Sequence, residues 1–492
     1  MRKMKKFQFE TLGGIRCVKT GEWLDQSSLI CTVRALSQKL KNNSIDANST
    51  VLICVSGRIG TIVSLFAVWS IGGTAAIVNA QSSDYEISEL KKLTEASLVL
   101  IDEPRKLDSL SLPQILATPI DNIYKELDLN DSVLEVPCSA RLILFTSGTT
   151  GKPKGVIHSI SGLNERVKLN IEVIGTTALS NSLCVLPLHF GHGLIGNCLT
   201  PLLGGCNVIF AEPGLATSAS FGNLVDEHSI SFVSSVPSFW NLVLRLSTPP
   251  KMQSLQRVHV GSASLSSTLW RNIINWSGCP VVNTYGMTEC ANWISGASSA
   301  DNQPVDGSVG KMWGGRAAVK LDDGEVVENG IGNLLISSPS LMLGYLEAPN
   351  VVCSGLSGIW FETGDIAEIS VDGDITLLGR KTYQIKKAGI KILPEEIELL
   401  LQRHESINDV CAFKISDDIA GELVGVAVVL DKANPCSVED LDEWLRKFLI
   451  KDKRPDHWFF VSKIGRKETG KINRTEVGRL AVMEHKLGET KC

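Results

Sequence analysis

The chain has 492 residues, more than one hydrophobic core usually accommodates, so the sequence predicts two or more domains. Hydrophobic residues make up 43% of it and the formal net charge is only −5, so neither nucleic acid nor an anionic membrane is expected as the main partner. The 13 cysteines are scattered without zinc-type spacing, and the basic N-terminus lacks the apolar core of a signal peptide. We therefore expect a cytoplasmic protein with reduced thiols.

Short apolar runs separated by helix-length segments recur through the first half of the chain. Runs that are apolar on both faces are typical of buried parallel strands in a layered α/β fold. The predicted strands are Val51–Val55, Ser97–Ile101, Leu142–Phe145, Leu183–Leu186, Asn207–Phe210, Ser231–Ser235 and Arg257–Val260. A longer apolar stretch, Ile62–Val78, is broken by Gly72 and Gly73, so it predicts a buried helix followed by a strand and not a membrane span.

Residues 146–155 read Thr-Ser-Gly-Thr-Thr-Gly-Lys-Pro-Lys-Gly and follow the predicted strand Leu142–Phe145. The glycines allow tight turns, while the hydroxyls and lysines offer donors to anionic oxygens, so the segment predicts a polyphosphate-binding loop. Pro153 stands where a Walker A loop has Ser or Thr, and Gly148 and Gly151 are too close together for that motif. The alternative is a surface loop without a ligand.

The segment Leu186–Gly193 contains the pair His189 and His192. Histidines three residues apart on a helix can bind zinc, but no third ligand is suggested. Gly191 and Gly193 also disfavour a helix here. We therefore expect no metal at this pair, and either histidine can instead line a binding pocket.

Residues 285–289 read Tyr-Gly-Met-Thr-Glu and follow the strand-like run Val281–Asn283. A tyrosine can stack on a purine, a threonine can bind a phosphate oxygen and a glutamate can hold Mg²⁺, so the pentapeptide predicts part of a nucleotide site. A strand-end turn with a buried tyrosine explains the same residues, and this alternative stays open.

From about Gly307 the chain changes to short glycine-rich strands, which predict a β-rich subdomain. Residues 363–365 read Thr-Gly-Asp, a common turn sequence, and Gly379-Arg380 follows them. Beyond this point a smaller α+β unit begins, so we predict a domain boundary near residue 380. Its elements are a helix opened by Pro394, strands at Val410–Ile415, Leu423–Leu430 and Trp458–Val461, and a helix from a capping box at Ser437 to near Ile450.

Two basic motifs lie in this C-terminal unit. Residues 386–389 read Lys-Lys-Ala-Gly, and residues 469–474 read Thr-Gly-Lys-Ile-Asn-Arg. A lysine can offset negative charge that accumulates in a transition state. The alternative is a solvated basic surface, since Lys463, Arg466 and Lys467 lie close by in the sequence.

Together, and in this order, these motifs resemble those of the AMP-forming adenylating superfamily, which includes acyl-CoA synthetases, peptide-synthetase adenylation domains and luciferases. The resemblance extends from about Asp46 to Asn473. It implies an α/β fold with a large N-terminal domain, residues 1–380, that binds ATP and the acid. This domain would contain layered parallel sheets with helices and a β-rich subdomain. Residues 381–492 would form a small mobile α+β lid domain with a hinge near 380–382.

The resemblance also implies roles for individual residues. The phosphate loop would hold the β- and γ-phosphates of ATP through Thr146, Ser147, Gly148, Thr149, Thr150, Gly151 and Lys154. Tyr285 would lie on the adenine, beside an adenine loop that contains Ser262 and Ala263, and Asn283, Thr284 and Gly286 would also contact the nucleotide. The remaining contacts would be Asp365 and Arg380 to the ribose, Thr288 to the α-phosphate and Glu289 to Mg²⁺. Lys471 would serve adenylation, and rotation of the lid would exchange it for Lys386 or Gly389 during thioester formation.

The sequence departs from the superfamily pattern at two places. Thr382 stands at the hinge position, where Asp or Lys is usual. Phe190 falls where many acyl-activating members have histidine, and Gly191 replaces the aspartate that pairs with the α-ammonium of an amino acid. Because a buried unpaired ammonium is costly, the substrate is expected to lack an α-amino group. The expected pocket residues are His189, Phe190, His192, Gly193, Val236 and Trp240.

The sequence therefore predicts an enzyme that uses ATP and Mg²⁺ to convert a carboxylic acid to an acyl-adenylate with release of pyrophosphate. Transfer of the acyl group to coenzyme A is the first expectation. The alternatives are the phosphopantetheine thiol of a separate carrier protein or an amine. A non-catalytic nucleotide-binding protein is the alternative from a different class.

Overall fold

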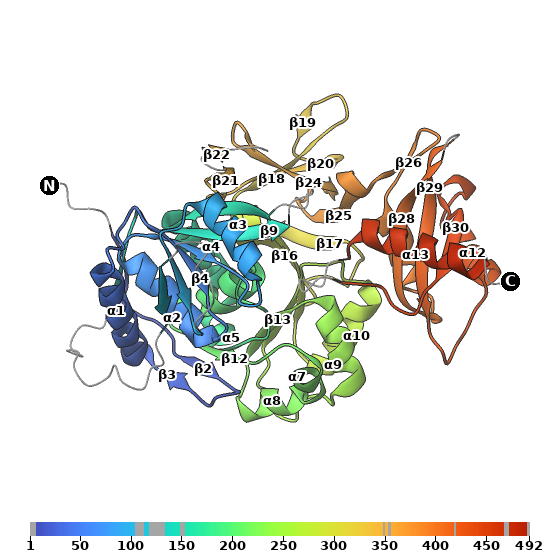
Figure 1. Ribbon diagram of the computed structural model, residues 1–492. Helices are drawn as coiled ribbons and strands as arrows, with labels where there is room; N and C mark the ends of the chain where they lie inside the picture. The colour runs from blue at the N-terminus through green and yellow to red at the C-terminus, as the bar shows by residue number, and fades with distance from the viewer. Residues whose placement is uncertain are drawn as a thin grey trace.

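The computed structural model describes residues 6–103, 113–117, 133–147, 153–347, 350–352, 356–417, 420–466 and 472–489. A large N-terminal part, blue to yellow in Figure 1, lies beside a smaller C-terminal part in orange and red. The chain passes between them after β25 (Ile375–Arg380), through the short helix η5 (Lys381–Tyr383).

The first sheet of the large part has eight strands in the described ranges, in the order β22-β21-β10-β9-β5-β4-β6-β7. The run from β9 to β7 is parallel, and β9, β10, β21 and β22 pair antiparallel. Their bounds are β4 Thr50–Cys54, β5 Thr74–Ile77, β6 Leu98–Ile101, β7 Gln114–Leu116, β9 Arg141–Ser147, β10 Pro153–Ser159, β21 Gly344–Glu347 and β22 Asn350–Val352.

The second sheet has a parallel half and an antiparallel half. In the parallel half, β2 (Ile15–Cys17), β12 (Asn207–Phe210), β11 (Asn181–Cys184), β13 (Phe232–Ser235), β14 (Arg257–Val260) and β15 (Val281–Met287) lie side by side, and β3 (Trp23–Leu24) closes the edge. The antiparallel half continues through β16 (Asn292–Ser298), β17 (Ser308–Met312), β25, β24 (Trp360–Ile369), β20 (Gly330–Ser337), β18 (Arg316–Lys320) and β19 (Val326–Val327), with β23 (Leu356–Ser357) paired to β24. A separate ribbon joins β1 (Lys6–Phe9) to β8 (Leu134–Pro137).

Side chains alternate between the two faces of each strand, so each sheet packs against a layer on either side. In β4, Val51 and Ile53 face a core shared with the helices between the two sheets and with β12, whereas Leu52 and Cys54 face α3. The helices between the sheets are α1 (Gln26–Asn42), α2 (Arg58–Ser70), α4 (Ile160–Ile174) and η3 (His192–Leu199). Helix α3 (Asp84–Thr94) covers the outer face of the first sheet, and α8 (Phe221–Glu227), α9 (Pro237–Leu246) and α10 (Ser267–Ser277) cover that of the second. Three short helices complete the layers: α5 (Thr176–Leu179), α6 (Thr200–Leu203) and α7 (Leu215–Ala219).

The small part is built on a five-stranded sheet in the described ranges, with β26 (Ile385–Lys387), β27 (Ile390–Ile392), β28 (Ile407–Asp417), β29 (Gly421–Leu430) and β30 (His457–Phe460). Helices α11 (Pro394–Leu401) and α12 (Val438–Arg446) share one core with it, and α13 (Arg474–Glu489) covers its other face. The predicted capping box at Ser437 is present. The prediction that its helix continues to near Ile450 is wrong, because Ile450 is extended and precedes the short helix η6 (Lys451–Lys453).

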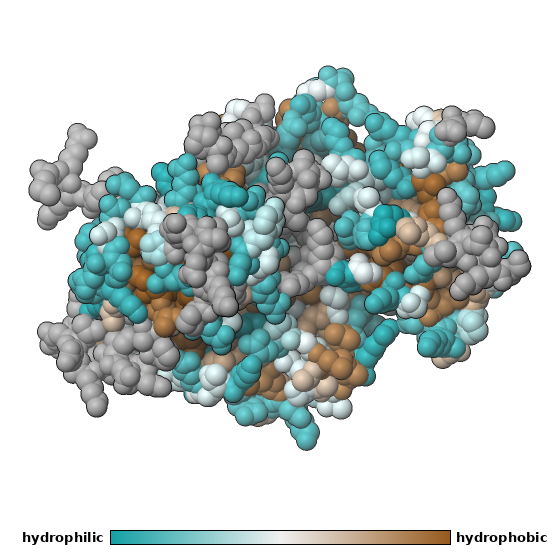
Figure 2. Space-filling view, in the orientation of Figure 1, coloured by the Kyte–Doolittle hydropathy of each residue, from teal (hydrophilic) through white to brown (hydrophobic). Residues whose placement is uncertain are grey.

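The predicted fold class is thus confirmed, with the difference that both sheets extend their parallel strands by antiparallel ones. The apolar stretch Ile62–Val78 forms most of α2 and the strand β5, as expected. Among the helices that the structure describes, none is both long and apolar enough to cross a membrane. Hydrophilic residues predominate on the face shown in Figure 2.

An aromatic cluster holds α8, α9 and α10 against the second sheet. Trp240 of α9 is fully buried, and its ring lies 5.6 Å from that of Phe221 and 5.7 Å from that of Trp276. We expect Trp240→Ala to lower the free energy of unfolding by about 3–5 kcal/mol, because it removes the centre of this cluster. Urea denaturation followed by circular dichroism measures the change. The matched control is Leu242→Ala on the exposed side of the same helix, and an equal loss in both variants would contradict the assignment.

Candidate active site

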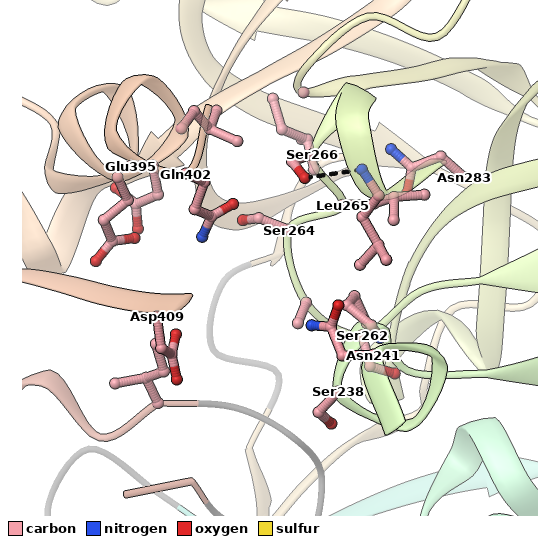
Figure 3. Close-up of a pocket in the computed structure, with 18 of the residues that line it drawn as sticks. Ser238, Asn241, Ser262, Ser264, Leu265, Ser266, Asn283, Glu395, Gln402 and Asp409 are labelled. Carbon is pink, nitrogen blue, oxygen red and sulfur yellow. Dashed lines mark hydrogen bonds between the residues drawn. The ribbon is translucent and has the colours of Figure 1, made fainter. Parts of the chain in front are cut away.

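A cavity of about 540 Å³ lies between the large and small parts, and both line it. Figure 3 shows side chains converging on it from opposite sides: Ser238, Asn241, Ser262 and Asn283 from the large part, and Glu395, Gln402 and Asp409 from the small part. Tyr285, Asp365 and Arg380 also contribute to the lining. Residues more than a hundred positions apart in the sequence thus form one site.

One end of the cavity is organised around the carboxylate of Asp365. The Tyr285 hydroxyl donates a 2.6 Å hydrogen bond to Asp365 Oδ2, and Arg380 Nε lies 2.7 Å from Oδ1. Asp365 and Arg380 are cross-strand partners in β24 and β25, which fixes their approach. Burial and the neighbouring carboxylate raise the pKa of Tyr285, so this phenol remains a donor. A predicted ribose-binding pair and a predicted adenine residue are therefore in direct contact.

A second cluster surrounds Glu289, which lies in the short helix η4 (Thr288–Cys290) directly after β15. The Tyr345 hydroxyl donates to Glu289 Oε1 at 2.7 Å, and Lys154 Nζ lies 5.2 Å from the centre of the Tyr345 ring. Burial, with Glu289 close by, raises the pKa of Tyr345, which keeps the phenol protonated. The predicted Mg²⁺ ligand and the lysine at the end of the phosphate loop thus share one neighbour. One protein carboxylate beside substrate phosphates is a common way to hold Mg²⁺, so this donor set fits the ion.

The predicted adenine loop lies against β15. A side chain at Gly261 would place its Cβ 2.4 Å from Thr284 Oγ1, so only glycine permits this approach. The next residue, Ser262, has a positive φ of 68° and starts the turn that brings Ser262 and Ala263 to the cavity beside Asn283. Ser262 and Ala263, which match the adenine loop of the superfamily only loosely in sequence, therefore lie in a loop at this cavity.

The segment 186–193 differs from its prediction. The π-helix η3 begins at His192 and includes Gly193, so the expectation that the glycines prevent a helix is wrong. Glycine is required here because a Cβ on Gly193 would lie 2.2 Å from the Pro187 carbonyl oxygen. The His192 ring nitrogens lie 2.8 Å from Ser262 Oγ and 2.7 Å from Ser234 Oγ. His192 therefore supports the adenine loop from behind, outside the lining of this cavity.

Two further predicted pocket residues, Val236 and Trp240, do not line this cavity. Trp240 belongs to the aromatic core, and Val236 is buried where α9 begins. The residues of α9 that line the cavity are instead Pro237, Ser238, Asn241, Leu244 and Arg245. The prediction followed sequence position, whereas the helical repeat turns Trp240 away from the face that carries Ser238 and Asn241.

His189 and Phe190 stack on each other with ring centres 4.0 Å apart, and both are half-buried. Neither lies in the lining of this cavity. In the described ranges no group of three histidine, cysteine or acidic side chains could hold a metal ion.

Several predicted residues lie outside the described ranges: Gly148, Thr149, Thr150, Gly151 and Lys471. Strand β9 ends at Ser147 and its partner β10 begins at Pro153, so the two paired strands flank the phosphate loop. Ile472, the neighbour of Lys471, lines the cavity. Lys386 is exposed and does not line the cavity, and its backbone N–H donates to Glu422 Oε2 at 2.7 Å.

The sequence reasoning missed Arg474, which starts α13. Its guanidinium lies 2.8 Å from Glu395 Oε1 and 2.9 Å from Glu398 Oε2, and it stacks 5.4 Å from the centre of the Tyr383 ring. This buried cluster ties the residue three positions after Lys471 to α11 and to the hinge segment. The sequence did contain a signal for this contact, because the acidic first turn of α11 had no basic residue assigned to it as a partner.

The profile of AMP-binding enzymes matches residues 9–346, and that of the AMP-binding enzyme C-terminal domain matches residues 396–471. The chain belongs to the family of AMP-binding enzymes. The prediction of an AMP-forming, acid-activating ligase is confirmed by this membership and by the relatives below.

Two relatives and one solved structure are similar to the chain. It is 27% identical over 467 residues to an oxalate–CoA ligase of Arabidopsis thaliana, covering 91% of each chain. It is 28% identical to a malonate–CoA ligase of the same plant, covering 68% of this chain and 60% of that enzyme. Its fold matches that of the o-succinylbenzoate CoA synthetase of Bacillus subtilis in complex with an acyl-adenylate, with a TM-score of 0.82, 20% identity, and 96% and 98% of the two chains covered.

The buried side chain of His158 in β10 makes the stability of the protein depend on pH. Its buried ring donates to the Thr288 carbonyl, and burial lowers its pKa to about 4. Because the folded-state pKa lies below the unfolded value, the stability from neutral His158 is complete above about pH 6.5 and is lost as the pH falls toward 4. From the two pKa values, about 2 kcal/mol is lost by pH 5.

We expect His158→Gln to reduce the drop in unfolding free energy between pH 7 and pH 5 by about 2 kcal/mol. Urea titrations at the two pH values measure it, with His457→Gln on the surface as the control. An unchanged pH dependence in His158→Gln would show that this ring is not buried in its neutral form.

Proposed function

We propose that this protein activates a carboxylic acid with ATP and then transfers the acyl group to coenzyme A. The observation that supports the proposal most directly is the arrangement of the two clusters along β15. The Tyr285–Asp365–Arg380 cluster, suited to a ribose and its base, precedes Thr288 and Glu289, suited to phosphates and Mg²⁺. A nucleotide lying along β15 meets both clusters.

Within this proposal the residues have the following roles. Asp365 and Arg380 bind the ribose, and the loop from Gly261 packs against the adenine. Thr288 binds the α-phosphate, and Glu289 with the phosphates would hold Mg²⁺, which neutralises phosphate charge when bound. Residues 146–154 bind the terminal phosphates. Lys471 stabilises charge during adenylation.

We also propose that residues 1–380 and 381–492 act as two domains that change orientation between the two half-reactions. Lys386 is exposed and away from the cavity, whereas Ile472 lines it. This orientation corresponds to the adenylation step, and a rotation about Thr382, which is exposed in η5, would bring Lys386 in. Because threonine is uncharged, no ion pair of this side chain has to break or form during that rotation.

We propose a small acid with two acidic groups and no α-amino group as the substrate. Two relatives are named as ligases of oxalate and malonate, and Gly191 leaves no carboxylate to pair with an α-ammonium. The pocket is expected in the region of His189–Gly193, which lies next to the adenine loop through the bond of His192 to Ser262. A cytoplasmic location is supported by the cysteines of the described ranges, which are all free thiols.

Replacement of Lys471 by alanine is expected to reduce acid-dependent ATP–pyrophosphate exchange by at least about 100-fold, because a positive charge on the transition state is lost. Lys432→Ala, on an exposed loop of the small domain, serves as the control and is expected to keep wild-type exchange. Near-normal exchange in Lys471→Ala would contradict the role given to this lysine.

The acceptor and the acid are tested together with the wild-type enzyme. Oxalate, malonate, acetate and benzoate are each incubated with ATP, Mg²⁺ and one of three acceptors: coenzyme A, a holo-carrier protein or a simple amine. We expect a thioester with coenzyme A and preference for the two diacids, measured by mass spectrometry. Amide formation without any thioester, or a thioester with the carrier alone, would refute the proposed acceptor.

A further inference from the structure

A buried carboxylate, Asp306, joins the large and small parts at the edge of the cavity. Its Oδ2 accepts a 2.9 Å hydrogen bond from Arg403 Nε and a second bond from Arg403 Nη2. Its Oδ1 accepts a 2.5 Å bond from the backbone N–H of Ser267. The Asp306 side chain is only 7% exposed, and that of Arg403 is 40% exposed.

Asp306 lies where three elements of the site meet. Ser267 is the first residue of α10, which faces the small part in Figure 1, and it follows shortly after the adenine loop. Gly307, the next residue, lines the cavity, and its carbonyl accepts a 2.9 Å bond from Leu377 of β25, the strand that ends at Arg380. A contact to Asp306 therefore positions the small part relative to both the adenine and the ribose residues.

Arg403 has a similar position on the small part. It follows α11, whose Glu395 and Glu398 hold Arg474 close behind Lys471. The Arg403–Asp306 pair thus connects the helix that supports the Lys471 segment to the nucleotide-binding residues of the large part.

The other polar contacts recorded between the described portions of the two parts are weaker. Lys391 Nζ lies 2.9 Å from Asp322 Oδ2, but these side chains are 53% and 86% exposed, and such surface pairs contribute little. Arg245 Nη2 donates to the neutral Asn408 Oδ1 at 2.9 Å. The Asp306 pair differs because a planar guanidinium donates two bonds to one well-buried carboxylate.

We propose that Arg403 and Asp306 form a latch that holds the small domain in the orientation for acid activation and opens for transfer to coenzyme A. The inference rests on the proposed function, since it assigns the latch to one of its two half-reactions. Asp306 keeps its bond to Ser267 in either orientation because both residues belong to the large domain, and the N-terminus of α10 stabilises its charge. Arg403 is already partly exposed and regains water when the latch opens, so opening remains energetically accessible.

The variants Asp306→Asn and Arg403→Gln test the latch. Asparagine retains an oxygen for the Ser267 N–H but places an uncharged side chain before Arg403. We expect the rate of pyrophosphate exchange to fall about 5- to 10-fold in each single variant, because the closed orientation is less populated. Thioester formation from supplied acyl-adenylate and coenzyme A is expected to stay unchanged or to become faster. The double variant is expected to be no slower than either single one. Lys391→Gln is the matched control and is expected to leave both rates unchanged.

A second measurement needs no catalysis. Small-angle X-ray scattering of the wild-type protein and the variants, with and without ATP, reports the separation of the two domains. We expect a larger radius of gyration in both latch variants than in wild type and Lys391→Gln. Arg403→Gln changes an exposed side chain and keeps the latch testable even where Asp306→Asn is poorly folded.

Equal losses in both half-reactions, additive effects in the double variant, or unchanged scattering would each overturn the latch. A wild-type enzyme without exchange on any acid would instead refute the proposed function. The scattering comparison would still decide whether Asp306 and Arg403 hold the domains together.

Discussion

The carboxylate of Asp365 is the contact on which the arrangement of the site depends. It joins Tyr285, in the last strand of the parallel half of the second sheet, to Arg380, the last residue of β25 in the antiparallel half. The hinge segment begins directly after Arg380. One buried acidic group therefore links Tyr285, Arg380 and the start of the small domain. Loss of Asp365 would leave a buried phenol and a guanidinium without their shared partner.

Behind this contact, two close approaches of the backbone place the loop from Gly261 and the start of η3. Gly261 lets the adenine loop reach Thr284, and Gly193 lets η3 start against Pro187. His192 then joins the two segments through serine hydroxyls on both sides of its ring. The segment expected to select the acid and the loop expected to hold the adenine are consequently parts of one hydrogen-bonded unit. This arrangement is suited to an enzyme that must bring a carboxylate to a nucleotide.

Within the described ranges, few recorded polar contacts join the small domain to the large domain. Arg474 and its two glutamates organise the small domain internally, whereas the recorded polar contacts to the large domain involve Arg403, Lys391 and Asn408. A strong internal core beside a sparse polar interface is the pattern expected where two domains change orientation without unfolding. The cavity lies at that interface, so any change in orientation alters its lining.

The sequence by itself determined many of the strands and the family, and it predicted residues for a nucleotide site, because each depends on local patterns. Apolar runs defined β4, β6 and β9, and residues 285–289 and 363–365 carried their chemistry in short motifs. Only the tertiary structure decided which side chains meet. Trp240 and Asn241 are adjacent in sequence, yet one lies in the core and the other at the cavity, because a helix turns neighbours to different sides. The partners of Glu289 and Asp306 lie 56 and 97 positions away. Such pairings arise from the packing of distant strands and helices, which no local pattern records.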